Sequence, residues 1–361
     1  MLSEPSARLT VADFLGTCPA PFAHHDRVLL GHGSGGRLSA DLIHRLFLPI
    51  LGNETLSRLE DQATCSLAPH ADVRIAFTTD SFVVRPIFFP GGDIGKLAVH
   101  GTVNDLAMGG ATPLFISAAF ILEEGLTIDD LRRIVQSMRE ACDSAGVVLV
   151  AGDTKVVDRG KGDQIFITTS GIGIVPRGRT LSAAACRPGD QIILSGTIGD
   201  HGIAIMSVRE GLDFETTLES DTASLADLTR VMLGCCPDIR CMRDPTRGGV
   251  SSALHEIAAA SHVGMTLTEA AIPVRAEVRG ACELLGLDPL YVANEGKLIA
   301  IVPAAAAPGL VDTMKAHPRG IDAAVVGEVT AHHPGMVVMR SRVGGERVVT
   351  MLAGEQLPRI C

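Results

Sequence analysis

The stretch "LLGHGSGGR", residues 29–37, decides between two kinds of fold. Gly31, Gly33 and Gly36 match the G-x-G-x-x-G spacing of a dinucleotide-binding turn, and the helical pattern "LSADLIHRLFLPIL" follows them. A dinucleotide fold also needs a second strand that ends in an acid about 20 residues further on. The next region, "GNETLSRLEDQATCSL", is typical of helix or irregular chain, so Asp61 does not end a strand. This pattern argues against a doubly wound sheet.

The same loop does not match a P-loop, because Arg37 and Leu38 follow Gly36 where Lys and Ser or Thr would be needed. The motif alone fits a flexible turn without a ligand as well as it fits a binding loop.

The rest of the first half alternates irregularly between strands and helices. Strands are predicted at 73–80, 113–122, 147–154 and 163–175. One helix follows Asp93 as its cap and ends at Gly109–Gly110, and a second follows the capping pair Thr127 and Asp130 and ends at Gly146. Strands and helices without regular alternation predict an α+β fold.

The second half begins with "GDQIILSGTIGDHG" (189–202), a strand followed by a glycine turn. In "RDPTRGGVSSALHEIAAASHVG" (243–264), Asp244 is predicted to cap a helix that has Pro245 at its first position. Late strands are predicted at 296–302 and 335–340. The predicted division is a flexible arm (1–26), an N-terminal α+β domain (27–178), a C-terminal α+β domain (179–345) and a mobile tail (346–361).

Composition excludes several classes of protein. The 361 residues carry 31 Lys and Arg against 41 Asp and Glu, a net charge of −10 without a basic cluster, which argues against nucleic acid binding. No apolar run approaches the roughly 20 residues that cross a bilayer, and the first residues do not resemble a signal peptide. Nine cysteines without zinc spacing predict reduced thiols in a cytoplasmic protein.

Four acids stand beside glycines or at element ends, namely Asp61, Asp80, Asp105 and Asp244. Such carboxylates suit Mg²⁺, which prefers hard oxygen ligands and often shares nucleotide phosphates. For any one of them taken alone, helix capping or surface charge is the simpler explanation. Lys155, after "AGDT", is either a phosphate-neutralising group or a solvated loop lysine.

Taken together, the motifs resemble the ATP-dependent superfamily of aminoimidazole ribonucleotide synthetase and selenophosphate synthetase. The matching segments run in order over about residues 29–303, as "GSGGR", "EDQA", "TTDSFVV", "NDLAMGGATP", "AGDTKVV", "GDQIILSGTIGDHG", "RDPTRGGV" and "NEGKL". Within that superfamily the terminal "PRIC" is similar to the HypE family of carbamoyl dehydratases, which act in NiFe hydrogenase maturation.

The resemblance implies a two-domain fold in which N-terminal domains pair in a homodimer. It implies ATP and Mg²⁺ as cofactors, with the glycine-rich loop closing over the nucleotide. The implied nucleotide-binding residues are Gly33, Ser34, Gly35, Gly36, Asp80, Asn104, Asp153, Gly248 and Gly249, and the implied metal ligands are Asp61, Asp80, Asp105 and Asp244.

The resemblance also implies the chemistry of the terminal residue, Cys361. A carbamoyl group on this thiol would be dehydrated to a thiocyanate with ATP, with Lys155 and Glu295 polarising and deprotonating it and Asp105 serving either there or at the metal. The carbamoyltransferase HypF would load the thiol, and a HypC–HypD scaffold complex would take the cyanide onto iron. A tail of about 15 residues could extend roughly 50 Å, which would let the thiol move between these partners and its own site.

Two other functions compete with this one. A relative acting on a free small molecule, such as a purine-pathway amidine or selenide, would not need Cys361. A carrier or interaction protein of the same fold would use the tail without consuming ATP.

Overall fold

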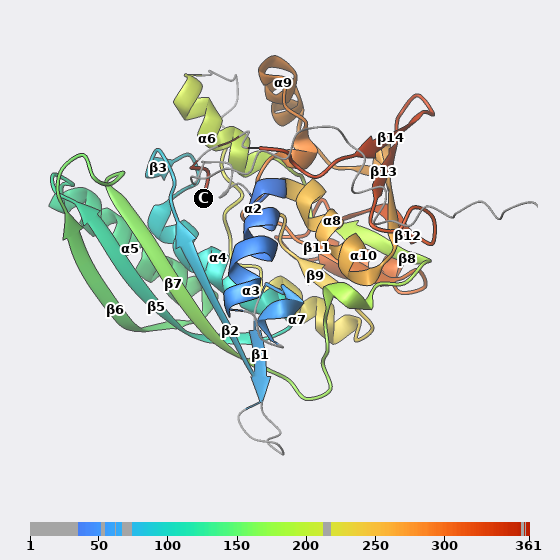
Figure 1. Cartoon of the computed structure of the whole chain (residues 1–361), viewed down its shortest axis with the longest axis horizontal. Coiled ribbons are helices and arrows are strands. Elements are labelled where there is room, and N and C mark those ends of the chain that lie inside the picture. Colours follow the sequence, from blue (N-terminus) through green and yellow to red (C-terminus); the bar gives the residue numbers. More distant parts are fainter. Residues whose placement is uncertain are drawn as a thin grey trace, which may run out of the picture.

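The computed structural model describes residues 35–51, 55–61, 63–66, 74–211, 218–354, 357 and 359–361 (Figure 1). The predicted arm and the first part of the glycine loop, with Gly33 and Ser34, lie outside these residues. Three helical segments follow the loop as predicted, namely α2 (Arg37–Leu42), a π-helical turn (Ile43–Phe47) and α3 (Leu48–Leu51).

A five-stranded sheet forms the centre of the N-terminal half. Its order is β1 (Ala63–Ser66), β2 (Arg74–Phe82), β7 (Ile165–Val175), β5 (Thr112–Glu123) and β6 (Val148–Val157). All neighbours are antiparallel except β5 and β6. A short 3-10 turn (Leu56–Arg58) precedes β1, and the small pair β3 (Phe88–Phe89) and β4 (Gly92–Asp93) leads into the first long helix.

Helices α4 (Ile94–Met108) and α5 (Ile128–Ala145) cover one face of this sheet (Figure 1). The predicted caps are confirmed, since Asp93 accepts hydrogen bonds from the N–H groups of Gly95 and Lys96, and Thr127 accepts one from Asp130. Helix α4 is buried almost all round, whereas α5 buries one stripe and exposes the rest. Hence α4 is the inner helix and α5 the outer one.

The opposite face of the sheet is exposed. Side chains alternate along each strand, so that Ala76 and Thr78 of β2 are buried under α4 while Phe77 and Thr79 face outward. Strand register places four apolar residues in one row across this outer face, namely Phe77, Ile172, Phe115 and Val148. The row on one side of it is mostly polar, with Thr79, Ser170 and Ser117, whereas on the other side Ile75 pairs with Ile174.

The C-terminal half contains a seven-stranded sheet. Its order is β14 (Glu346–Val349), β13 (Val337–Arg340), β10 (Gly264–Thr268), β12 (Ala324–Thr330), β8 (Asp190–Leu194), β11 (Ile299–Pro303) and β9 (Cys241–Arg243), in which only β10 and β13 are parallel. The helices of this half are α6 (Asp200–Glu210), α7 (Ala226–Cys235), α8 (Gly249–Ser261), α9 (Ala276–Leu285) and α10 (Ala307–Lys315), with 3-10 turns at Ala183–Ala185, Glu269–Ala271 and Pro289–Tyr291.

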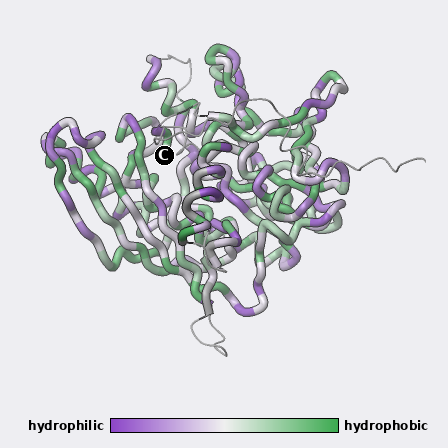
Figure 2. The backbone as a smooth tube through the Cα atoms, in the orientation of Figure 1, coloured by the Kyte–Doolittle hydropathy of each residue, from purple (hydrophilic) through white to green (hydrophobic). Residues whose placement is uncertain are grey.

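Both faces of this second sheet are buried. Ile192 and Leu194 of β8 pack toward α8, while Ile193 packs in a separate cluster with α7 and α10. Figure 2 shows hydrophobic and hydrophilic segments mixed through both halves of the molecule. The second cluster also contains Ala107 and Met108, the last turn of α4, so this helix joins the cores of both halves.

Two predicted elements differ in the structure. Helix α8 begins at Gly249, with Gly248 as its cap. Both glycines adopt left-handed backbone conformations, which do not continue a helix from Arg247. The prediction that Asp244 caps this helix is therefore wrong, and its carboxylate is left for another role. Residues 346–349, assigned to the tail, form β14 and pair with β13.

No helix among the described residues is both long enough and apolar enough to cross a membrane.

Candidate active site

Four predicted metal ligands converge where the two halves meet. Asp80 lies on β2, Asp105 near the end of α4, Asp61 just before β1, and Asp244 just after β9. The Thr78 hydroxyl donates to Asp105 Oδ2 at 2.7 Å and lies 3.0 Å from the Asp61 carbonyl oxygen. Residues far apart in the sequence therefore form one acidic cluster.

The electrostatics of the cluster show how close these carboxylates are. Burial raises the pKa of Asp61 to about 6, against the opposing effect of Arg243, whose Nε lies 2.9 Å from Asp61 Oδ1. Burial and the negative charge of Asp61 raise the pKa of Asp244 to about 8. Burial, reinforced by Asp244, raises the pKa of Asp105 well above its ordinary value. Several buried acids that repel one another are typical of a site that receives a cation.

The carboxylates suit Mg²⁺, although they do not form a complete protein cage. Among the described residues, no three His, Cys, Asp or Glu side chains are grouped so that they could hold a metal ion by themselves. Mg²⁺ is usually held by one or two carboxylates together with water and substrate phosphates. The donor set fits that shared arrangement, with Asp61, Asp80, Asp105 and Asp244 as the residues that would hold it.

Glu295 lies in the same place, on the loop before β11. Its side chain is 3% exposed, and its Oε1 has no hydrogen-bond partner among the described residues. Burial, with Asp244 and Asp221 nearby, raises its pKa well above the ordinary value. Its backbone N–H donates to Asp221 Oδ1 at 3.0 Å, and Lys297 Nζ lies 3.3 Å from Asp221 Oδ2. The loop is therefore fixed while the carboxyl group keeps a free oxygen.

Asn104, predicted to contact nucleotide, uses its amide within the chain. Nδ2 donates to the carbonyl oxygens of Ala223 (3.0 Å) and Glu295 (3.4 Å), and Oδ1 accepts from the N–H of Leu225 at 2.8 Å. The structure thus gives Asn104 the role of holding the Glu295 loop.

The thiol of Cys361 reaches this cluster from the end of the chain. It lies near Glu295, and burial, followed by the charge of Glu295, raises the pKa of the thiol well above the ordinary value. Asp80 has the same effect on the thiol, while Arg247 opposes it. The tail thereby brings its sulfur to the acids that the sequence associated with ATP.

Arg247 is a site residue that sequence reasoning missed. Its Nη2 lies 3.9 Å from Asp80 Oδ1, and the charge of Cys361 is the largest effect raising its pKa. The signal was available, because Arg247 lies inside the quoted motif "RDPTRGGV", and an acidic site that binds phosphates needs a cation.

The predicted glycines meet beside Arg247. Gly35 has a φ of +71°, and a Cβ there would collide with the Arg247 backbone, while a Cβ on Gly248 would collide with Ser252 and with the Gly35 carbonyl oxygen. Gly249 is packed equally closely against Leu290, and Gly36 against Leu352. Side chains are excluded here because two loops cross in contact.

Asp153 and Lys155 lie elsewhere. They form an exposed ion pair on β6, with Nζ 2.8 Å from Asp153 Oδ2. Strand pairing joins Asp153 to Ala119, Ala119 to Thr168 and Thr168 to Ser81, all on the outer face of the sheet. Asp80 is the neighbour of Ser81 and therefore points to the inner face. Lys155 does not join the acidic cluster of its own chain.

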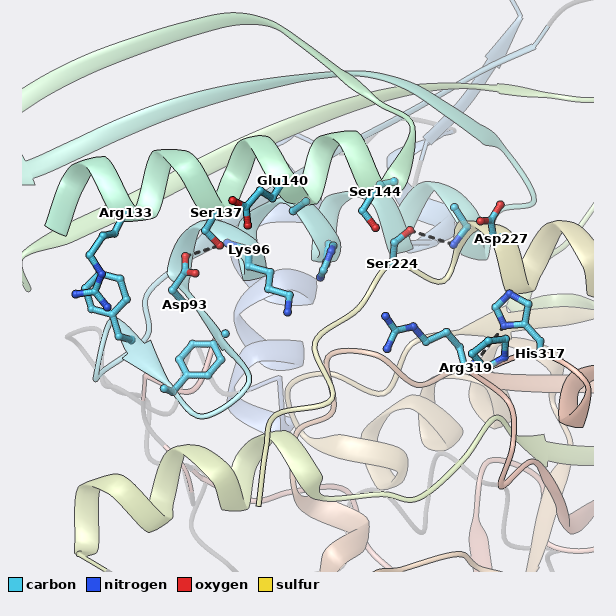
Figure 3. Close-up of a pocket in the computed structure, with 18 residues that line it drawn as sticks. Asp93, Lys96, Arg133, Ser137, Glu140, Ser144, Ser224, Asp227, His317 and Arg319 are labelled. Atoms are coloured by element: carbon cyan, nitrogen blue, oxygen red, sulfur yellow. Dashed lines mark hydrogen bonds between the residues drawn. The ribbon is translucent and has the colours of Figure 1, made fainter. Parts of the chain in front are cut away.

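A separate cavity of about 840 Å³ opens between α4, α5 and the start of α7 (Figure 3). Lys96 and Arg319 point toward it, and burial together with these two cations lowers the pKa of His100 to about 3. None of the predicted site residues lines it.

Comparison with known proteins places this geometry in a family. Residues 60–175 match the N-terminal domain, and residues 187–339 the C-terminal domain, of AIR synthase related proteins. The chain is 57% identical over 330 residues to "Carbamoyl dehydratase HypE" of Azotobacter vinelandii, covering 91% of this chain and 96% of that protein. The chain belongs to the HypE family.

Two solved HypE structures share the fold closely. One is HypE in complex with ATP, at 49% identity and a TM-score of 0.78 over 93% of this chain and all of that one. The other is a HypE–HypF complex, at 47% identity and a TM-score of 0.81 over 86% of this chain and 99% of that one. The family establishes the expected α+β architecture of paired AIR synthase domains.

Proposed function

We propose that this chain is an ATP-dependent carbamoyl dehydratase that converts an S-carbamoyl group on Cys361 into a thiocyanate, and so supplies cyanide for NiFe hydrogenase maturation. The observation that carries the proposal is the position of the Cys361 thiol, which lies near Glu295, Asp80 and Arg247 at the acidic cluster. The HypE relatives, one of them solved with ATP, support it. A terminal sulfur at a nucleotide site is consistent with a tail that is itself the substrate.

The reaction removes one oxygen and two N–H protons from S–CO–NH₂. Oxide is not a usable leaving group near neutral pH, whereas phosphate is. The carbamoyl oxygen takes the terminal phosphoryl group of ATP with release of ADP, and one N–H proton leaves. Loss of the second proton then breaks the C–O bond, which gives S–C≡N and phosphate.

The residues of the chain would position the tail and handle these protons. Glu295 is next to the sulfur, has an oxygen without a partner and has a raised pKa, which are the properties of a base that works near neutral pH. Arg247 lies near the same sulfur, and its positive charge would stabilise the negative charge that develops on the transferred phosphoryl group. The crossing of Gly35 with Gly248 leaves backbone without side chains beside Arg247, which would suit phosphate binding.

A homodimer through the outer face of the five-stranded sheet forms part of the proposal. The row of Phe77, Ile172, Phe115 and Val148 leaves an apolar strip exposed on a sheet whose other face is covered. A second copy packed on this strip would bury it by two-fold symmetry. It would also bring Asp153 and Lys155 of one copy toward the site of the other.

The partners and location follow from the same chemistry. The HypE–HypF complex supports HypF as the enzyme that loads Cys361, and a HypC–HypD complex would accept the cyanide on iron. Cys142, Cys186, Cys235, Cys236, Cys241, Cys282 and Cys361 are free thiols, which fits the reducing cytoplasm.

Intact mass measurement tests the proposal and separates it from the two competing functions. After incubation with HypF, carbamoyl phosphate and ATP, the chain should carry a carbamoyl adduct that loses the mass of water. Cys361→Ala should abolish the adduct and leave ATP binding unchanged. Turnover of a free substrate by that variant would favour the small-molecule enzyme, and an adduct that persists with ATP would favour the carrier.

A further inference from the structure

The motif "GDHG" contains a buried histidine that the proposed reaction does not use. His201 lies in the first turn of α6 and is fully buried. Its Nε2 is 2.7 Å from the carbonyl oxygen of Ile360, and its Nδ1 is 2.7 Å from Ser220 Oγ. A carbonyl oxygen only accepts, so Nε2 carries the hydrogen. Ser220 Oγ accepts from the N–H of Thr222 and can donate its own hydrogen to Nδ1.

The backbone of the last three residues is held from both sides. The N–H group of Val83 donates to a main-chain carboxylate oxygen of Cys361 (3.1 Å), and that of Arg85 donates to the carbonyl oxygen of Arg359 (3.2 Å). The carbonyl oxygen of Ile360, which lies between these two groups in the chain, is 2.7 Å from His201 Nε2 instead. His201 satisfies that group, which would otherwise be buried without a partner.

Side chains add a second set of contacts. Arg359 Nη1 lies 2.6 Å from Asp163 Oδ2, and Ile360, 4% exposed, belongs to the core of the N-terminal half. Arg209 donates to the carbonyl oxygens of both Arg85 and Arg359. The tail is therefore recognised through its main chain, one arginine and one apolar side chain.

We propose that His201 and Asp163 are positioning residues that dock the C-terminal segment Arg359–Cys361, and thereby set where the Cys361 sulfur lies relative to Glu295. The purpose of the docking rests on the proposed function, but the docking itself does not. The Ile360 carbonyl that His201 holds belongs to the peptide bond that joins Ile360 to Cys361. Loss of this hydrogen bond should therefore free the Cys361 sulfur as well as the rest of the segment.

Alkylation of Cys361 measures docking without ATP, carbamoylation or turnover. The full-length chain is treated with iodoacetamide and the labelling rate of each cysteine is followed by peptide mass mapping. Docked Cys361 should react more slowly than the same cysteine in the free peptide LPRIC. Exposed Cys235 provides an internal reference in every sample.

Two His201 variants separate docking from packing. His201→Phe keeps a ring against Phe89 but removes the donor, and should raise Cys361 labelling about fivefold, as expected for one buried hydrogen bond. His201→Gln keeps an N–H donor and should restore much of the protection. Asp163→Asn, at a partly exposed ion pair, should raise labelling about twofold, whereas Asp143→Asn, which breaks the remote pair with Arg139, should leave it unchanged.

Several results would overturn the proposal. Wild-type Cys361 that reacts as fast as the free peptide would show that the tail is not docked. Unchanged labelling in both His201→Phe and Asp163→Asn, with unaltered melting temperature, would show that these residues do not hold it. If His201→Phe fails to fold, Asp163→Asn still decides. A protected Cys361 in a chain that never forms nitrile would leave docking standing while the proposed function fails.

Discussion

On the inner face of the five-stranded sheet, β2 presents Asp80 to a buried acidic site beneath α4, whereas one residue further along Ser81 faces outward with the exposed pair Asp153 and Lys155. Both faces contain residues that the sequence assigned to a single site. The inner group is assembled within one chain and has strongly raised pKa values. The outer group is exposed and lies beside an apolar row. One site can use both groups only if a second molecule supplies the outer one.

The largest effect is expected on the inner face. Glu295→Gln should still accept the carbamoyl group but form nitrile about 10² to 10⁴ times more slowly, because loss of a positioned base has that cost. The mass shift from carbamoyl to nitrile after addition of ATP gives the rate. Glu140→Gln, on exposed α5, is the matched control, and nitrile formation at the wild-type rate in Glu295→Gln would remove this residue from the mechanism.

A mixing experiment tests whether the outer face serves a partner. Lys155→Ala and Cys361→Ala should each be inactive alone. After the two are mixed and exchanged, about a quarter of wild-type activity should return, because half of the dimers combine an intact thiol on one chain with an intact lysine on the other. If activity does not return although mixed dimers form, Lys155 does not act across an interface.

The apolar row provides a direct test of the interface itself. Phe115→Glu places a carboxylate in the middle of the row, and burying it unpaired should weaken self-association by more than about tenfold. Light scattering after size-exclusion chromatography gives the mass. Val208→Glu changes a similarly exposed residue on α6, away from the row, and should not alter the mass. A dimer that survives Phe115→Glu would have to use another surface.

The smallest expected effect is on the stability of the folded chain at low pH, and it involves His100 on α4, which lies on neither face of the sheet. The pKa of His100 falls from 6.5 to about 3 through burial and the charges of Lys96 and Arg319. Between these pH values the unfolded chain binds a proton that the folded chain does not, so stability decreases as pH falls from 6.5 toward 3. In His100→Asn the melting temperature should decline less over this range, whereas the exposed-site control His44→Asn should follow the wild type.

The sequence predicted what depends on local pattern. Asp93 and Thr127 cap their helices as expected, because capping needs only the residue and the first turn that follows it. The same rule failed at Asp244, where Gly248 and Gly249 allow a left-handed turn and delay the helix. The short β1 was missed because its four residues form a strand only by pairing with β2.

The candidate site was predictable only in part for the same reason. Acids beside glycines indicated Asp61, Asp80, Asp105 and Asp244, which the structure brings together. Spacing alone cannot show which face of a sheet a residue occupies, so Lys155 was grouped with residues from which strand pairing separates it. His201 gave no signal of its own, because its partner is a main-chain carbonyl group 159 residues away.

Helix α4 packs in both cores, with its middle against the first sheet and Ala107 and Met108 inside the second. Because one continuous helix is packed in both cores, the two halves are not expected to move apart as rigid bodies about a hinge. The carbamoyl group would instead reach the acidic cluster on the C-terminal segment that carries Cys361. The two halves are then expected to keep their relative position during the reaction, while the C-terminal segment brings the reacting group to the site.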